Sequence, residues 1–257
     1  MKENDKKSNR KYLKILIIIV IIILGLVAIY YTNPDILPSS IRDPADSLSN
    51  DINIFFDNKE SDASIIKIGE NENGYVTLEG PYGDNSSNIT VAYIIGQHPR
   101  ESQAHNALKN EIESDSNKLH YKYYIYNIHV TKNISDFSAS RMNGQLLARE
   151  FVVPDIISKD YRLVVDIHAS NAFYYQEPYI FTPKSSGDSY TYAQKIVSEN
   201  KEWLSYYEPP EYTSPQYSTE PIKDSGIPAL VFEAYGEPGI TIDEQIHRLV
   251  STIDNLR

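Results

Sequence analysis

The chain has 257 residues, enough for one well-buried domain with a short appendage, and it carries 24 Lys and Arg against 35 Asp and Glu. The formal net charge of −11 argues against a nucleic-acid-binding surface, which needs a basic patch. Cysteine is absent, which excludes a disulfide framework, a cysteine-ligated metal and a cysteine nucleophile.

An apolar run near the N-terminus predicts a membrane anchor. Residues 15–31 read ILIIIVIIILGLVAIYY, without a charge, and are just long enough to cross a bilayer as a helix. Because several lysines and an arginine precede this run, we expect residues 1–14 to stay in the cytoplasm and the rest of the chain to lie outside. A cleaved signal peptide is the alternative, but the run is long for one and no small-residue cleavage site follows it. We therefore prefer an uncleaved single-pass anchor.

The segment after the anchor has the composition of a stalk or linker. Residues 32–62 are polar and contain three prolines, with one short helix expected near 45–56. The folded domain is then expected to occupy residues 63–257.

Strand and helix patterns alternate through this domain. Runs of β-branched and aromatic residues predict strands at 64–70, 74–80, 89–96, 121–130, 161–169, 178–183 and 228–234. Apolar residues at helical spacing predict helices at 99–114, 142–152, 188–204 and 240–256. Strands that alternate with helices indicate an α/β domain of three layers.

One segment of the domain lacks a periodic pattern. Residues 205–227 contain four prolines and four tyrosines, and the segment is too long for an ordinary connection. We therefore expect a functional loop that lies over a site.

Ionisable residues stand at the carboxyl ends of three strands that are expected to be buried. They are His98 and Glu101 after the first strand, Asp166 and His168 in the second, and Glu233 in the third. Sites in open α/β sheets form beyond these ends, and a buried ionisable group is costly unless it is paired or ligated. Three such ends in one domain indicate a functional site.

The types and spacing of these residues suit a catalytic metal. His98 and Glu101 are three residues apart at a strand-to-helix junction, so both can point to one place, where His168 would arrive from a neighbouring strand. Two His and one carboxylate are a usual set for catalytic zinc, with a fourth position left for water. Bound zinc lowers the pKa of that water toward about 7. Glu233 is then the candidate general base, which takes the proton of the water and delivers it to a leaving amine. We expect one Zn²⁺ per chain.

Three motifs resemble those of the carboxypeptidase A-like zinc metallopeptidases and their relatives, the succinylglutamate desuccinylase and aspartoacylase group. GQHPRE resembles the His-x-x-Glu zinc motif, VVDIHAS the strand with the third ligand, and PALVFEAYG the strand with the catalytic glutamate. Their order and contexts match over residues 89–235. The resemblance implies that His98, Glu101 and His168 hold zinc, with Glu233 as the base. It also implies an α/β/α sandwich with a mixed, mostly parallel sheet.

This family also uses arginines, one to polarise the scissile carbonyl and another to hold a substrate carboxylate. Arg141 with Asn143 is the best match for the arginine–asparagine element, and Arg149 is the reserve. The usual Asn-Arg pair is not present, and the interval between Glu101 and His168 is short for a digestive-type carboxypeptidase. These departures favour the compact, deacylase-like branch or a cell-wall amidase branch.

Family members place a substrate-capping tyrosine in a loop comparable to 205–227. Tyr212 and Tyr217 are the two candidates for that role.

Two further residues have alternative interpretations. His105 stands four residues after Glu101 on the same helical face, so this pair could mimic a zinc pair, but His98 fits the family context better and His105 is taken as a bystander. Asp166 shares a strand face with His168, so it either orients that ligand or caps a neighbouring loop.

Together these patterns predict a membrane-anchored zinc hydrolase outside the cytoplasm that cleaves an amide bond. Its expected substrate is a peptide or an N-acyl amino acid, including cell-wall peptide. The membrane is contacted through residues 15–31, and no nucleic-acid partner is expected. The rival hypothesis is a surface-anchored module on the same fold that holds a peptide or glycan without cleaving it. A binding module has no need for Glu233 at a buried strand end, which favours the enzyme.

Overall fold

The structure is a computed structural model that describes residues 63–170, 175–236 and 239–256. The expected cytoplasmic tail, membrane anchor and linker (1–14, 15–31 and 32–62) lie outside these residues. Within the described ranges, no helix has both the length and the apolar character needed to cross a membrane.

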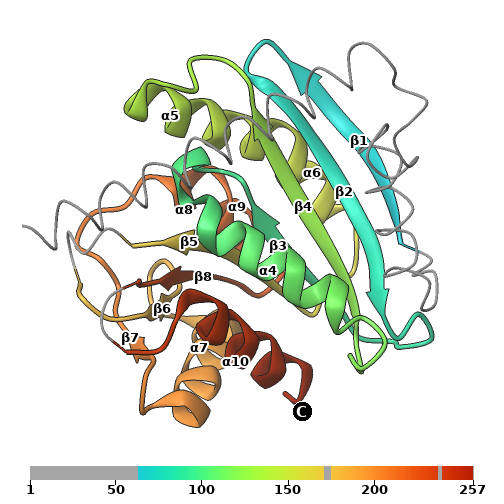
Figure 1. Ribbon diagram of the computed structural model, residues 1–257, viewed down its shortest axis with the longest axis vertical. Helices are drawn as coiled ribbons and strands as arrows, with labels where there is room; N and C mark the ends of the chain where they lie inside the picture. Colours follow the sequence, from blue (N-terminus) through green and yellow to red (C-terminus); the bar gives the residue numbers. More distant parts are fainter. Residues whose placement is uncertain (1–62, 171–174, 237–238, 257) are drawn as a thin grey trace, which may run out of the picture. The chain divides into compact units, whose positions relative to one another are not determined.

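A single mixed sheet of eight strands forms the centre of the described domain, in the order β1-β2-β4-β3-β5-β8-β6-β7 (Figure 1). The strands are β1 (Ser64–Asn71), β2 (Gly74–Gly83), β3 (Thr90–Ile95), β4 (Lys122–Val130), β5 (Leu163–Ala169), β6 (Tyr179–Phe181), β7 (Ser205–Tyr206) and β8 (Ala229–Ala234). The central strands β4, β3, β5 and β8 are parallel to one another. Antiparallel pairing brings in β2 beside β4, β1 beside β2, and β6 beside β8. The predicted α/β fold with a mixed sheet is therefore confirmed.

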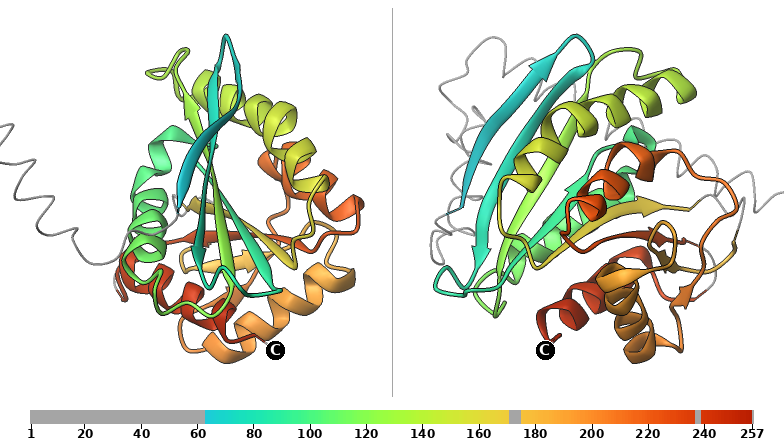
Figure 2. Two further views of the ribbon diagram at one scale, coloured as in Figure 1. Left: turned by 90° about the vertical axis from the view of Figure 1, so that its right-hand side faces the viewer. Right: turned by 180° about the vertical axis from the view of Figure 1, so that it is seen from behind.

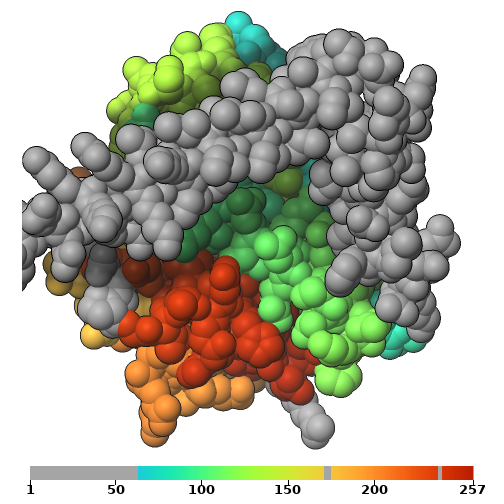
Figure 3. Space-filling view, in the orientation of Figure 1, coloured from blue at the N-terminus to red at the C-terminus, as the bar shows by residue number. Residues whose placement is uncertain are grey.

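Helices cover both faces of this sheet (Figure 2). One face is covered by α4 (Ser102–Ser114), α7 (Gly187–Asn200) and α10 (Ile242–Asp254). The opposite face is covered by α5 (Phe137–Leu147), α6 (Val153–Ile157) and α9 (Thr219–Asp224). On the outer surface, α4 and α10 lie side by side (Figure 3).

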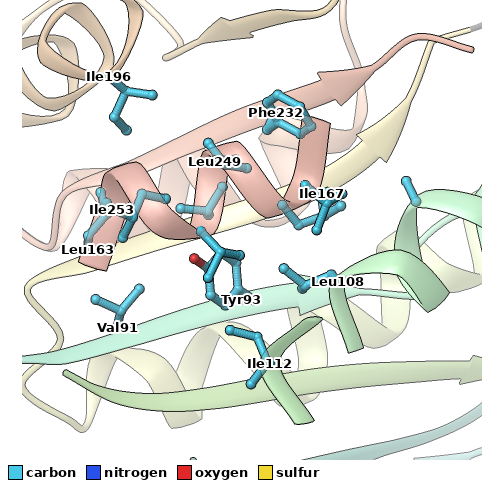
Figure 4. Close-up of a cluster of buried hydrophobic side chains, with 14 of the residues drawn as sticks. Val91, Tyr93, Leu108, Ile112, Leu163, Ile167, Ile196, Phe232, Leu249 and Ile253 are labelled. Carbon is cyan, nitrogen blue, oxygen red and sulfur yellow. The ribbon is translucent and has the colours of Figure 1, made fainter. Parts of the chain in front are cut away.

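The alternation of side chains along β3 explains why its sequence is almost continuously apolar. Val91, Tyr93 and Ile95 point toward α4 and α10, whereas Ala92 and Ile94 point toward α5 and α6. Figure 4 shows the first of these two cores, in which side chains from three strands meet those of three helices: Val91, Tyr93, Leu163, Ile167, Phe232, Leu108, Ile112, Ile196, Leu249 and Ile253. Two apolar layers hold β3 and β5 in place, so their carboxyl ends are rigid supports for side chains.

The helix predicted at 142–152 is wrong in its bounds. α5 begins at Phe137 because Asp136 caps it, accepting a hydrogen bond from the backbone N–H of Ala139. A π-helical turn (Ala148–Val152) follows, and α6 then continues to Ile157. Pro154 is tolerated because it lies in the first turn of α6, where its missing N–H is not needed.

The segment 205–227 is not the structureless loop that its composition suggested. It contains β7, the single turn α8 (Ser214–Tyr217) and α9, which begins two residues later at Thr219. Each element is too short to produce a periodic pattern, and prolines occupy the first turns of both helices. The segment nevertheless packs beside the carboxyl ends of β3 and β5, as its contacts with the candidate site show below.

Candidate metal centre

A tight turn at the end of β3 presents His98 and Glu101. Gly96 has a φ of +81°, and a Cβ there would lie 2.1 Å from the carbonyl oxygen of Ile128, so a side chain would prevent this turn beside β4. A 3-10 turn (Pro99–Glu101) then starts directly after His98. The ring of Pro99 fixes the backbone of that turn and places Glu101 next to His98.

Helix α5 packs closely against this turn. A Cβ at Gly144 would lie 1.9 Å from the carbonyl oxygen of Gln97, so the glycine allows the helix to contact the loop that carries His98. The close approach brings two residues of α5, one helical turn apart, to the candidate ligands. Arg141 Nη1 lies 2.5 Å from Glu101 Oε1, and Gln145 Nε2 lies 3.3 Å from His98 Nε2.

His168 reaches the same place from β5. This strand pairs with β3 on one side and with β8 on the other, and the register sets His168 beside Glu233. Val164 belongs to the core under α5 and α6, and side chains alternate along the strand, so His168 points to that same face. The ring is 1% exposed.

The side chains of His98, Glu101 and His168 meet in one compact cluster. The two Nδ1 atoms of the histidines are 3.0 Å apart. Glu101 Oε1 lies 2.9 Å from His98 Nδ1, and Glu101 Oε2 lies 2.8 Å from His168 Nδ1. One ligand atom from each residue lies within 4.8 Å of the others, so the structure brings the expected metal-binding residues together.

The donor atoms of this cluster fit a zinc ion. Two imidazole nitrogens 3.0 Å apart repel each other unless a proton or a cation lies between them. Ligand atoms about 2.05 Å from a tetrahedral zinc are separated by roughly 3.3 Å, so the three side chains need only small outward shifts to bind one. The set contains two nitrogens and a carboxylate and no sulfur, which is the composition of a catalytic rather than a structural site.

The charges around the cluster also favour a cation. Burial alone would raise the pKa of Glu101, but His98 and His168 hold it well below its ordinary value. Burial lowers the pKa of His98 to about 4, so this ring is neutral and can offer a lone pair at neutral pH. Burial opposes protonation of His168 too, yet Asp166 and Glu101 raise its pKa well above the usual range. A metal ion bound at this ring would replace the positive charge that the two carboxylates attract.

Glu233 lies at the edge of the cluster on β8. Its position is paired with His168 on one side and with Tyr179 of β6 on the other. Burial raises the pKa of Glu233 to about 8, because the charged carboxylate loses its water shell. A divalent cation held by the neighbouring ligands would favour the ionised form, which is the form that a general base requires.

Asp166 lies beside His168 and contacts both this ring and the neighbouring segment. Its Oδ1 lies 3.1 Å from His168 Nε2, an ion-pair contact whose angle departs from that of a full hydrogen bond. Its other oxygen accepts a hydrogen bond of 2.7 Å from the hydroxyl of Ser218. A proton kept on Nε2 leaves the Nδ1 lone pair of His168 free to face the cluster.

The other residues proposed from the sequence lie around the cluster with contacts of different kinds. Arg141 contacts Glu101, as given above, and its guanidinium also lies over the ring of Phe137. The amide of Asn143 donates to the backbone carbonyl of Lys132 at 2.8 Å, which uses this side chain within the fold. Arg149 is exposed in the π-helical turn, with no ion pair to any described residue.

The two candidate tyrosines differ in their surroundings. Tyr212 is partly buried, its ring packs against Phe181, and its hydroxyl donates to Glu208 at 3.3 Å. Tyr217 is the last residue of α8 and is also partly buried. Both therefore belong to the segment that lies beside the cluster.

His105, taken from the sequence as a bystander, has a structural role. It is buried, and its Nε2–H donates to the backbone carbonyl of Ile167 at 3.1 Å. Because Ile167 precedes His168, this bond ties α4 to the end of β5. His105 therefore supports the strand that carries a ligand, while its ring lies outside the group of potential ligands.

Three polar residues next to the cluster were missed from the sequence. Gln145 contacts both His98 and Thr213, and Ser218 contacts Asp166. Hydroxyl and amide residues are common in loops and helices, so their types carry no specific signal. Only the packing of α5 and α8 against the strand ends reveals them.

Comparison with known proteins identifies solved structures with a similar fold. Neither models of protein families nor curated proteins match the sequence. Among solved structures, the chain is similar to a protein described as a carboxypeptidase from Burkholderia mallei, with a TM-score of 0.56, 15% identity and coverage of 80% of this chain and 66% of that chain. It is also similar to the metallo-carboxypeptidase of Pseudomonas aeruginosa, with a TM-score of 0.55, 14% identity and coverage of 84% and 68%.

A succinylglutamate desuccinylase/aspartoacylase from Rhodobacter sphaeroides is a further similar structure, with a TM-score of 0.47, 13% identity and coverage of 76% of this chain and 67% of that chain. The chain thus spans about two thirds of the length of these solved chains. The domain has the zinc carboxypeptidase-like fold that the motifs predicted.

Proposed function

We propose that the protein is a zinc-dependent hydrolase that cleaves an amide bond. The observation that carries this proposal is the meeting of His98, Glu101 and His168 at the carboxyl ends of β3 and β5, with Glu233 held on the adjacent strand. Zinc bound there would polarise the scissile carbonyl and lower the pKa of a bound water.

The side chains of the protein would divide the remaining tasks. Glu233 would accept a proton from the attacking water and deliver it to the leaving amine. The guanidinium of Arg141, about one-third exposed at the edge of the cluster, is placed to stabilise negative charge that develops on the carbonyl oxygen. Its ion pair with Glu101 keeps it in that position.

The contacts of the arginine–asparagine element bear on the substrate. Because Asn143 is engaged by the backbone of Lys132 and Arg141 by Glu101, these side chains do not form a ready clamp for a terminal carboxylate. This arrangement supports an amidase that acts within a peptide over a strict carboxypeptidase. Cell-wall peptide is the substrate that best suits a domain held outside the cytoplasm.

The proposed location comes from the sequence alone. Residues 15–31 would anchor the protein in the cell membrane, with residues 1–14 in the cytoplasm and residues 63–257 outside. Labelling of intact and of lysed cells with a membrane-impermeant reagent tests this orientation. The proposal predicts that the domain is labelled in intact cells. Labelling of the domain only after lysis would contradict it.

Hydrolysis of a defined panel tests the activity. The full-length chain in detergent is incubated with peptides, N-acyl amino acids and cell-wall peptide fragments, with zinc or with a chelator. The proposal predicts cleavage of at least one class at an amide bond, loss of cleavage with the chelator and its return with added zinc. Binding of a peptide or glycan without cleavage of any class would favour the surface-anchored binding module.

A further inference from the structure

The rings of His98 and His168 are both contacted, through one intervening side chain each, by residues that flank α8. Behind His98 stands Gln145, whose Nε2 also lies 3.2 Å from Thr213 Oγ1. Behind His168 stands Asp166, whose Oδ2 accepts the hydroxyl of Ser218 at 2.7 Å. Thr213 and Ser218 are the residues directly before and after the single turn α8. One turn of helix therefore reaches both rings, each through one intervening polar side chain.

The burial of the intervening groups makes these contacts significant. Gln145 is 2% exposed, and Asp166 and Ser218 are each 0% exposed. A buried polar atom that loses its hydrogen-bond partner carries the full cost of its desolvation, because water does not replace the partner. Loss of the Ser218 hydroxyl would leave a buried carboxylate oxygen unpaired. Thr213 is exposed, so water can partly replace its hydroxyl and the effect of its loss is smaller.

The orientation of the Gln145 amide depends on what His98 holds. In the structure the amide nitrogen faces His98, and the amide oxygen is buried without a hydrogen-bond partner among the described residues. A metal on Nδ1 of His98 leaves the ring proton on Nε2, which then needs an acceptor. A half-turn of the amide would offer its oxygen both to this N–H and to the hydroxyl of Thr213, so the contact with α8 would persist in the metal-bound state.

We propose that α8 is the positioning element of the metal centre: Thr213 and Ser218 hold Gln145 and Asp166, which in turn orient the rings of His98 and His168. This inference rests on the metal site of the proposed function. Because binding free energies are reciprocal, a metal ion in the cluster must stabilise α8 by the same amount that α8 strengthens metal binding. The turn carries Tyr217 and follows Tyr212, so the segment expected to contact substrate is coupled to the metal.

Zinc affinity of the full-length chain tests this coupling, measured by competition with a chelator of known affinity. We expect Ser218→Ala to weaken zinc binding about tenfold or more, in the range found for residues that orient metal ligands. Thr213→Val should weaken it by a few-fold, and Thr213→Ser, which keeps the hydroxyl, should restore it. Thr219→Val is the matched control, because its buried hydroxyl lies in the same segment without a described hydrogen-bond partner.

Two further readouts separate positioning from a general loss of folding. The visible spectrum of the Co²⁺-loaded chain reports ligand geometry and should change in Ser218→Ala but not in Thr219→Val. Hydrogen exchange of the amides of residues 211–219 should slow when zinc is added to the wild-type chain and should respond less in the Ser218→Ala variant.

The possible results distinguish this inference from the proposed function. Wild-type zinc binding with unchanged affinities, spectra and exchange in all the hydroxyl variants overturns the role of α8 and leaves the metal site intact. A wild-type chain that binds no zinc overturns both. A loss in Thr219→Val as large as in Ser218→Ala also overturns the inference, since it shows that any change in the segment disturbs the site.

Discussion

His168 and Glu233 occupy paired positions on the parallel strands β5 and β8, so the candidate ligand and the candidate base stand side by side in the sheet. The spacing between neighbouring strands, about 4.8 Å, is set by backbone hydrogen bonds rather than by a loop. The sheet itself therefore fixes how close the base lies to the metal. Metal binding and proton transfer are thus assigned to separate residues, and each residue can be replaced and tested by itself.

Replacement of Glu233 should abolish turnover without loss of the metal. Glu233→Gln keeps the size of the side chain but removes the group that accepts the proton, so we expect kcat to fall by a factor of about 10³ or more. Zinc content should stay at the wild-type value. Steady-state kinetics and metal analysis of the same sample check this, with Glu199→Gln on the exposed side of α7 as the control. Full activity in Glu233→Gln would remove this residue from the mechanism.

Gln145 offers a prediction in which a substitution improves binding. Gln145→Glu places an acceptor-only group behind His98, where it can accept both the ring N–H and the hydroxyl of Thr213. We expect its zinc affinity to rise several-fold, because a charged acceptor strengthens the hydrogen bond to a metal-bound imidazole. Gln145→Leu should have the opposite effect. Equal affinities of the two variants in chelator competition would show that Gln145 does not orient the ring.

His105 makes the stability of the metal-free protein depend on pH. Burial lowers the pKa of His105 to about 4, from a value near 6.5 in the unfolded chain. Between these values the unfolded state binds more protons, so the folded state loses stability as the pH falls from about 6.5 to about 4. The contribution amounts to at most about 3 kcal/mol.

Urea unfolding of the metal-free chain at several pH values measures this effect. His105→Gln keeps a donor for the carbonyl of Ile167 but does not titrate, so its stability should fall less steeply across that pH range. Parallel curves for the wild type and the variant would contradict the assignment of the pH dependence to His105.

The contact between α5 and the His98 loop should tolerate no added methyl group. Gly144→Ala would place a Cβ 1.9 Å from the carbonyl oxygen of Gln97, which forces the helix and the loop apart. We expect a loss of about 1–3 kcal/mol in the free energy of unfolding, as for other overpacked sites. Zinc affinity should fall with it, because the shift separates Gln145 from His98. Leu146→Ala, at the neighbouring exposed position of the same helix, is the control. A Gly144→Ala chain with wild-type stability would exclude this packing argument.

The elements that support the site could be predicted from the sequence because burial shapes their composition. β3, β5 and β8 are covered on both faces, so they appear in the sequence as continuous apolar runs. The ionisable residues at the carboxyl ends of these runs are therefore conspicuous. His98, Glu101, His168 and Glu233 were selected as candidates for that reason. To predict that these side chains lie close together, it was enough to expect neighbouring strands to be parallel.

The surroundings of the site could not be predicted in the same way. α8 is a single turn with no room for a periodic pattern, and the contacts of Ser218 and Gln145 depend on how separate elements pack. His105 was taken as a bystander because only its burial and its hydrogen bond to Ile167 show its structural role. The bounds of α5 were missed because they depend on one capping side chain, Asp136.

The zinc content of the purified full-length chain tests the central claim most directly. The chain is dialysed against excess zinc and then against metal-free buffer, and metal is measured by mass spectrometry beside His168→Ala and the control His120→Ala, an exposed histidine outside the potential ligand groups. We predict about one zinc per chain for the wild type and for His120→Ala, and close to none for His168→Ala. A stoichiometry near zero in the wild type, or an equal stoichiometry in all three chains, would contradict a zinc centre formed by His98, Glu101 and His168.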